Sequence, residues 1–468
     1  MTNLEAIKKL KKRVEDKPHE FRAVDDLFQM LRIYEQEDFK QAHTWNKDVR
    51  RIASRQVRNP KNPLSVRENF YMLNKRSLLF DAKSDLDAYL QYIEYDRDPD
   101  KRFYLPRRRI IRPLVNLLQK IDDDEIDLLS ISMPPGTGKS TLGIFFLTWI
   151  MGKYPNMPNL ASAHSDKLTR SFYDGVLSII KDPEYLWADV FPGLNIAKTN
   201  SKDETIDLEK PKRFSTLTCR SIDGSLTGAT RCEKILYADD LVSGIEQALS
   251  IDRLNSLWEK YTNDLKSRKK LGCKEIHIAT RWSVHDVIGR LEQLYGDDPR
   301  AVFYSMSALD ENDESNFDYD YGVGFDTKYF WDMRDSLDDV SWRCLFQNEP
   351  IEREGLLYHE DDLRRYYDLP GAKYDKHDRL ISFDEPDAIL GICDTAEGGG
   401  DYTFLPVAFA YGQDYYIDDC VCDNGLPEIT DVLCAEILLK YNVQQCRFES
   451  NNEAQIITRP KHLMHAKL

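Results

Sequence analysis

The feature that most constrains this chain is a glycine-rich loop between two apolar segments. Residues 128–133 have the composition of a buried strand, residues 142–147 that of a buried helix, and Pro-Pro-Gly-Thr-Gly-Lys-Ser-Thr lies between them at 134–141. A strand, loop and helix in this order turn backbone N–H groups and a helix N-terminus toward an anion. The pattern predicts a phosphate-binding loop, although Met133 stands where the strict pattern has glycine.

In such a loop the Lys139 ammonium reaches the β- and γ-phosphates of a nucleotide, and the Ser140 hydroxyl binds Mg²⁺. The predicted cofactors of this site are therefore ATP and Mg²⁺. The candidate nucleotide-binding residues are Pro135, Gly136, Thr137, Gly138, Lys139, Ser140, Thr141 and, from the motif described next, Asp239.

A second motif follows about a hundred residues later, where the short apolar strand 235–238 ends in two carboxylates, Asp239 and Asp240. P-loop ATPases place one acid here to hold the Mg²⁺ shell and a second to polarise the attacking water. Asp239 fits the first role and Asp240 the second, although the second position is more often Glu. The alternative is an edge strand that enters a solvated turn.

Composition limits the possible functions. The chain has 468 residues, enough for two to four domains, and a net charge of −16 that argues against general nucleic-acid coating. Local basic runs remain candidate DNA contacts or simply solvated faces: Arg50-Arg51 with Arg55 and Arg58, then Arg107 to Arg109, and Lys266 to Lys270.

No apolar run approaches the length of a membrane span. Nine cysteines without a Cys-x-x-Cys spacing suggest reduced thiols in a cytosol.

The hydrophobic pattern predicts an α/β fold with a parallel central sheet. The expected domains are a helical N-terminal region (1–100), a P-loop ATPase domain (101–305), a connector (306–380) and a second α/β unit (381–468). Core strands are expected at 128–133, 235–238, 275–279 and 301–304. Within the connector, helices are expected around 329–337 and 361–367.

Three further segments carry a family resemblance. Residues 161–165 (Ala-Ser-Ala-His-Ser) and 224–230 (Gly-Ser-Leu-Thr-Gly-Ala-Thr) resemble segments that surround the ATPase motifs of phage terminase large subunits. Residues 279–291, Ala-Thr-Arg-Trp-Ser-Val-His-Asp-Val-Ile-Gly-Arg-Leu, resemble that family's Thr-Arg-Trp-His-x-x-Asp-Leu-x-Gly-Arg-Leu stretch. The resemblance runs from about residue 101 to about 450.

In that family the last segment couples the nucleotide state to the rest of the motor. The resemblance therefore implies that Thr280 bonds the γ-phosphate or the attacking water, the alternative being an ordinary strand-end hydroxyl. Arg281 would either contact phosphate or brace the acidic strand ends. Many relatives carry an arginine inside the loop, but Gly136 and Thr137 stand there in this chain. An arginine finger would have to come from Arg281 or from a neighbouring subunit.

The C-terminal part resembles a ribonuclease-H-like nuclease. In that family, acids from the first and fourth strands hold two Mg²⁺ or Mn²⁺ ions that cleave a phosphodiester. Asp394 and Glu449 match those two positions, and Asp401 is either an auxiliary acid or a turn residue. The family's third acid has no counterpart, because no Asp or Glu follows Glu453. The resemblance thus implies an incomplete metal site and leaves open whether the nuclease domain is active.

Taken together, the resemblance implies an ATP-driven motor that packages viral duplex DNA into a procapsid, with an endonuclease that cuts concatemers. The implied catalytic residues are Lys139, Asp240, Thr280, Asp394 and Glu449, and the implied metal ligands are Ser140, Asp239, Asp394, Asp401 and Glu449. Implied partners are duplex DNA, a portal ring and a small terminase subunit, with no membrane and with oligomers only on the portal. The implied location is the host cytoplasm, docked on the procapsid. A helicase-like remodelling ATPase and a non-catalytic DNA-binding scaffold remain the alternatives.

Overall fold

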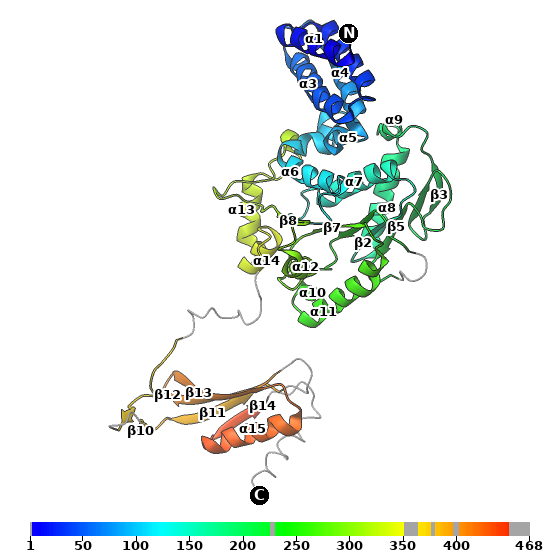
Figure 1. The fold of residues 1–468 in the computed structure, drawn as a ribbon. Helices are drawn as coiled ribbons and strands as arrows, with labels where there is room; N and C mark the ends of the chain where they lie inside the picture. Colours follow the sequence, from blue (N-terminus) through cyan, green and yellow to red (C-terminus); the bar gives the residue numbers. More distant parts are fainter. Residues whose placement is uncertain (1, 225–229, 351–363, 376–379, 396–401, 449–468) are drawn as a thin grey trace. The chain divides into compact units, whose positions relative to one another are not determined.

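The computed structural model describes residues 2–224, 230–350, 364–375, 380–395 and 402–448 (Figure 1). The chain forms two compact units, Met1–Glu354 and Gly355–Leu468, and each is described by itself. The first unit contains the helical N-terminal region and the large sheet, and the second contains a smaller sheet.

Five helices open the first unit, and short polar residues start several of them. Thr2 and Glu5 form a capping box, and Asp38 and Asp85 each accept a backbone N–H from the first turn of their helix. The paired Asn-Pro dipeptides at 59–63 separate the third helix from the fourth, as the sequence predicts. The helices are α1 (Asn3–Asp16), α2 (Phe21–Tyr34), α3 (Phe39–Arg58), α4 (Leu64–Ala82) and α5 (Leu86–Tyr92).

An eight-stranded sheet in the order β3-β4-β5-β2-β6-β7-β1-β8 forms the centre of the first unit. The strands from β5 to β8 in that order run parallel, and the β3–β4 and β4–β5 pairs are antiparallel. The strands are β1 (Leu128–Ser132), β2 (Asn159–Ala163), β3 (Ile196–Asn200), β4 (Thr205–Leu208), β5 (Leu217–Ser221), β6 (Ile235–Asp239), β7 (Lys274–Ala279) and β8 (Ala301–Ser305).

Helices cover both faces of this sheet, and alternate side chains of each strand enter different cores. On β6, Ile235 and Tyr237 pack with α6 (Tyr104–Asp122) and α7 (Lys139–Lys153), whereas Leu236 and Ala238 pack with the helices that follow β6. The remaining helical segments are α8 (Asp166–Lys181), α9 (Trp187–Val190), α10 (Ile245–Ala248), α11 (Ile251–Lys260), α12 (Val287–Tyr295), α13 (Thr327–Ser336) and α14 (Asp339–Leu345), with short turns η1 (Pro99–Lys101), η2 (Tyr261–Leu265), η3 (Lys266–Arg268) and η4 (Asp320–Gly322).

The second unit holds a four-stranded mixed sheet in the order β13-β12-β11-β14. Its first three strands are antiparallel, and β14 returns parallel to β11 after helix α15. The elements are β9 (Lys373–Tyr374), β10 (Leu380–Ser382), β11 (Ala388–Cys393), β12 (Thr403–Tyr411), β13 (Asp414–Asp423), α15 (Pro427–Lys440) and β14 (Gln445–Phe448). The predicted fold class is confirmed: a P-loop α/β unit with a helical N-terminal region, followed by a ribonuclease-H-like sheet.

One predicted element is wrong. Residues 361–363 lie outside the described residues, and 364–367 form no helix. The Tyr366 hydroxyl donates to the Ile417 carbonyl oxygen at 3.0 Å, and its ring meets Tyr416 edge-on. Docking of this aromatic side chain on β13 therefore overrides the local helical pattern.

Helices in the described part of the chain lack the length and apolar character that a bilayer crossing requires.

Close packing of α7 on β6 generates a prediction. A Cβ atom at Gly143 would lie 1.9 Å from the Tyr237 hydroxyl and 2.4 Å from its ring, whereas one at Gly175 of α8 would meet only the tip of Ile144 at 2.8 Å. Gly143→Ala should therefore lower the free energy of unfolding by about 1–3 kcal/mol, because the buried ring cannot move away. Gly175→Ala is the matched control and should be neutral or stabilising, since alanine favours the helix. Urea unfolding of both variants provides the measurement, and equal losses would contradict the packing described.

Candidate functional site

The loop after β1 has the backbone that its glycines permit. Gly136 and Gly138 have φ values of 76° and 98°, a left-handed region that other residues enter at a cost. The Thr137 hydroxyl donates to the Pro134 carbonyl oxygen at 2.8 Å, and α7 begins at Lys139. Met133, at the position where the strict pattern has glycine, is buried in the core. The departure from the pattern therefore serves packing and leaves the loop intact.

Residues far apart in the sequence meet at the carboxyl edge of the sheet. Strand β7 lies between β6 and β1, so the residues that follow these three strands are neighbours. The Lys139 ammonium donates to the Thr280 hydroxyl at 2.9 Å and lies 3.7 Å from the Asp240 carboxylate. The Ser140 hydroxyl donates to Asp239 at 3.1 Å. The structure thus brings together the five residues that the sequence singles out for this site.

The two carboxylates have different surroundings. Asp239 is 7% exposed, and burial, together with the charge of Asp240, raises the pKa of Asp239 to about 7. Asp240 has a φ of 42°, which turns the chain sharply after β6. Its side chain accepts the Thr280 backbone N–H at 2.8 Å, and His164 Nδ1 donates to its carbonyl oxygen at 2.7 Å. Asp240 is therefore held in one orientation.

A cavity of about 430 Å³ opens beside these groups. Its walls include Pro135, Gly136, Gly138, Lys139, Ser140 and Thr141 from the loop, and His164, Asp240, Val242, Ser243, Thr280 and Trp282 from the neighbouring strand ends. The N-terminus of α7 faces the same loop and provides unpaired backbone N–H groups. The cavity has the charge and the size needed for the phosphates of a nucleotide.

Arg281 connects the end of β7 to helix α12. Its guanidinium is 3.1 Å from Asp286 and 3.6 Å from Glu292. Asp286 also accepts the Trp282 and Gly289 backbone N–H groups, the latter as the N-cap of α12. These contacts brace the loop before α12, and the described ion pairs of Arg281 do not include the acidic strand ends that the sequence suggested.

Two residues of the segment 279–291 have fixed positions for structural reasons. The first is Asp286, which binds Arg281 and caps α12. The second is Gly289, because a Cβ atom there would lie 2.1 Å from the Val284 carbonyl oxygen. Only glycine therefore lets the first turn of α12 close against the preceding loop while Asp286 caps it.

Sequence reasoning did not single out Arg107 at this site. Its guanidinium lies over the rings of Phe103 and Tyr319, and its Nε is buried without a hydrogen-bond partner. A Cβ atom at Gly138 would be 3.2 Å from that Nε, so Arg107 directly adjoins the loop. Tyr319 donates its hydroxyl to the Thr137 carbonyl oxygen at 2.9 Å. Because Tyr319 is some 180 residues from the loop, only the fold could show this contact.

Each basic run has at least one cation that is engaged by a carboxylate. Arg50 pairs with the buried Asp81, Arg108 makes two 2.8 Å hydrogen bonds to Asp87, and Lys269 donates to Glu275 at 2.6 Å. The runs are therefore partly built into the fold and are not wholly solvated faces.

The candidate nuclease site is described only in part. Asp394 follows β11, is exposed, and forms a two-way backbone bridge with Phe404 of β12. Strands β11 and β14 pair in parallel with Cys393 opposite Phe448, and Glu449 follows Phe448 in the sequence. Glu449 and Asp401 themselves lie outside the described residues. Within the described ranges, no group of three or more His, Cys, Asp or Glu side chains could hold a metal ion.

Comparisons with known proteins give only a weak likeness. No family model and no curated protein matches the sequence. The large terminase of a thermophilic bacteriophage has a TM-score of 0.35 and 10% identity, over 75% of this chain and 80% of that one. The same phage protein in complex with ATP-gamma-S has a TM-score of 0.32 and 12% identity, over 74% and 76%. The HK97 bacteriophage large terminase has a TM-score of 0.36 and 13% identity, over 75% and 73%. At these values a function has to be inferred from the site itself.

The bracing role of Arg281 predicts unequal effects of its two partners. Asp286→Ala should lower the free energy of unfolding by about 3 kcal/mol or more, because it leaves a buried guanidinium and a helix N-terminus without their acceptor. Glu292→Gln should cost less than about 1 kcal/mol, since the Glu292 side chain is 53% exposed. Chemical unfolding of both variants measures the difference. Similar losses would show that the Asp286 contacts are unimportant.

Proposed function

We propose that the first unit binds and hydrolyses ATP with Mg²⁺. The observation that carries this proposal is the convergence of four side chains on one cavity beside the N-terminus of α7: Lys139, Ser140, Asp240 and Thr280. Asp239 adjoins them through its hydrogen bond from Ser140. Three separate strand ends supply these residues, which is how P-loop ATPases build their sites. A non-catalytic scaffold would not need this arrangement.

The residues divide into binding and catalytic roles. Lys139 contacts the phosphates, and the N–H groups of the loop surround them. Ser140 and Asp239 would hold Mg²⁺, which would supply charge neutralisation at the phosphate oxygens. This pair fits a divalent cation, because a buried carboxylate beside a second carboxylate is ionised more easily next to a cation. Asp240 accepts the proton of the attacking water, and Thr280 positions that water or the γ-phosphate.

Lys139 donates to Thr280 and lies near Asp240, so the proposed phosphate ligand and the proposed catalytic groups share the same ammonium. Thr280 continues directly into Arg281, which is joined to α12 through Asp286. We propose this connection as the route by which the nucleotide state reaches the rest of the chain.

The substrate that we propose for the motor is viral duplex DNA, packaged into a procapsid. The resemblance of residues 161–165, 224–230 and 279–291 to terminase segments supports this proposal, as does the order of a P-loop unit followed by a ribonuclease-H-like unit. A portal ring and a small terminase subunit would be the protein partners, with assembly on the portal in the host cytoplasm. Asp394, Glu449 and Asp401 would hold Mg²⁺ or Mn²⁺ for DNA cleavage.

ATP hydrolysis stimulated by duplex DNA tests the proposal. Lys139→Ala should reduce the rate by about 10²–10³-fold or more, because it removes a preorganised cation from the transition state. Lys167→Ala changes an exposed lysine at the start of α8 and should leave the rate unchanged. Hydrolysis that survives in Lys139→Ala would place the activity elsewhere, and no hydrolysis by the folded unaltered chain with DNA would contradict the function.

The raised pKa of Asp239 predicts a pH dependence. Below about pH 7 the carboxyl holds a proton in the metal-free protein, and Mg²⁺ must displace it. The apparent Mg²⁺ affinity in the presence of nucleotide should therefore fall by up to about tenfold per pH unit below 7 and level off above it. For the same reason, the metal-free protein should lose stability as the pH rises toward 7, because ionisation is costlier in the folded chain.

Calorimetric titration in two buffers of different ionisation enthalpy measures this proton release. Asp239→Asn serves as the control, because it keeps the proton equilibria of the nucleotide itself and removes those of Asp239. The same Mg²⁺ affinity at pH 6 and pH 8 in the unaltered protein, with no proton released, would refute the assignment.

A further inference from the structure

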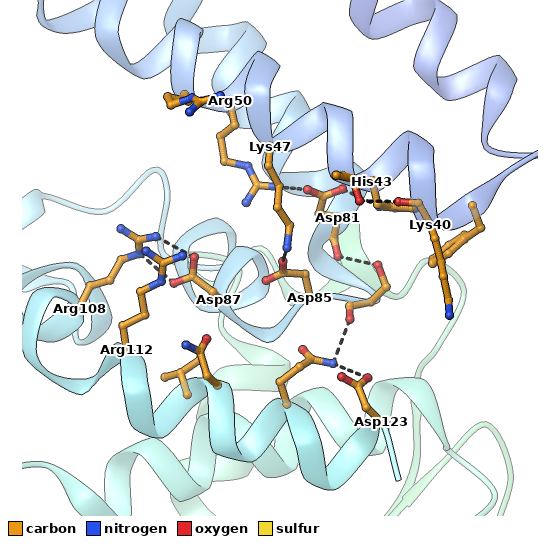
Figure 2. Close-up of a pocket in the computed structure, with 17 residues that line it drawn as sticks. Lys40, His43, Lys47, Arg50, Asp81, Asp85, Asp87, Arg108, Arg112 and Asp123 are labelled. Carbon is orange, nitrogen blue, oxygen red and sulfur yellow. Dashed lines mark hydrogen bonds and ion pairs between the residues drawn. The ribbon is translucent and has the colours of Figure 1, made fainter. Parts of the chain in front are cut away.

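A second and larger cavity, of about 720 Å³, lies among the helices of the N-terminal region (Figure 2). Helix α3 forms one wall, the segment that joins α4 to α5 forms another, and α6 forms the third. None of the residues that line it lines the nucleotide cavity. Nothing proposed so far for this chain uses it.

The cavity is rich in cations. It is lined by Lys40, Lys47, Arg50, Arg51, Arg108 and Arg112, against four aspartates, in a chain whose net charge is −16. Residues spaced by three or four along α3 and α6 share a helix face, so these side chains gather on the two facing walls. In Figure 2, Arg108 and Arg112 extend from α6 toward the side where Arg50 and Lys47 extend from α3.

Three of the four aspartates are paired with cations of the protein. Asp81 accepts a hydrogen bond from His43 Nδ1 at 2.5 Å and also pairs with Arg50. Asp87 accepts two hydrogen bonds from Arg108 and one from the Tyr104 hydroxyl. Asp85 pairs with Lys47 and accepts the Ala88 N–H. Asp123 accepts a hydrogen bond from the neutral Gln119 amide and keeps its charge.

Positive charge in the cavity is left without full compensation. Arg50 is mostly buried, and among the described residues its Nε has no hydrogen-bond partner. Burial lowers the pKa of Arg50; the carboxylates of Asp85 and Asp87 oppose that shift, and the guanidinium of Arg108 adds to it. The described ion pairs around the cavity also leave out Lys40 and Arg112, which are both exposed. Two guanidinium groups from facing helices thus repel each other, and the exposed Lys40 and Arg112 add positive charge to the cavity wall.

We propose that this cavity binds a phosphate group between the basic residues of α3 and α6. Guanidinium groups match phosphate oxygens with paired hydrogen bonds, and an anion placed here would offset the repulsion between Arg50 and Arg108. The volume exceeds that of one phosphate and admits a larger molecule that carries it. That molecule is either a small phosphate compound or the backbone of a nucleic acid, and the two can be distinguished.

The test measures binding of two probes, inorganic pyrophosphate and a short duplex DNA, by the full chain. All proteins carry Lys139→Ala, so that the nucleotide site contributes little and ATP hydrolysis is not part of the readout. Arg112→Glu reverses an exposed cation of the cavity, and Lys40→Glu does so on the opposite wall. Lys120→Glu is the matched control, because Lys120 is exposed on the same helix as Arg112 but does not line the cavity.

Pyrophosphate binding that weakens at least about tenfold in Arg112→Glu and Lys40→Glu, but little in the control, supports the site with a small phosphate ligand. DNA binding that weakens in the same two variants supports a nucleic-acid backbone as the ligand. In that case the slope of log K against log salt concentration should also become smaller by about one. If both cavity variants, shown to be folded by their unfolding curves, bind both probes as the control does, the proposal is wrong. Because hydrolysis is not measured, none of these outcomes depends on the proposed ATPase function.

Discussion

The arrangement of the nucleotide site depends on one buried ammonium group. Lys139 is 6% exposed, and a buried charge without a partner would cost several kcal/mol. Its partners are Thr280 at 2.9 Å and Asp240 at 3.7 Å. These are the residues proposed to act on the γ-phosphate and on water. The structure therefore satisfies this buried ammonium with groups that are also proposed to act in catalysis.

The order of the strands makes these contacts of Lys139 possible. Because β7 lies between β1 and β6, the residue that follows β7 stands between the loop and the two carboxylates. Thr280 can bond Lys139 through its hydroxyl and Asp240 through its N–H at the same time. The next residue, Arg281, is fixed to α12 through Asp286. Thr280, which contacts Lys139, is thus one residue from Arg281, and Arg281 pairs with the residue that caps the N-terminus of α12.

Much of this architecture could be predicted from the sequence, because its signals are local. Glycines that permit positive φ, apolar strands and carboxylates at strand ends are all read within a few residues, and they predicted the loop, Asp239 and Asp240. Thr280 was predicted from the family resemblance of residues 279–291. Contacts made by tertiary packing could not be read in this way. Arg107 and Tyr319 adjoin the loop from distant segments, and Tyr366 leaves the expected helix in order to dock on β13.

The basic runs show the same limit most clearly. Consecutive helical residues point about 100° apart, so three arginines in a row cannot form one patch on α6. Arg107 lies against the phosphate-binding loop, Arg108 bonds Asp87, and Arg109 donates to the Asp318 carbonyl oxygen. Residues spaced by three or four do share a face, and Arg108 and Arg112 meet the cations of α3 in the second cavity. In this acidic chain the proposed anion site therefore lies where two helix faces meet, and a run of consecutive basic residues in the sequence does not reveal it.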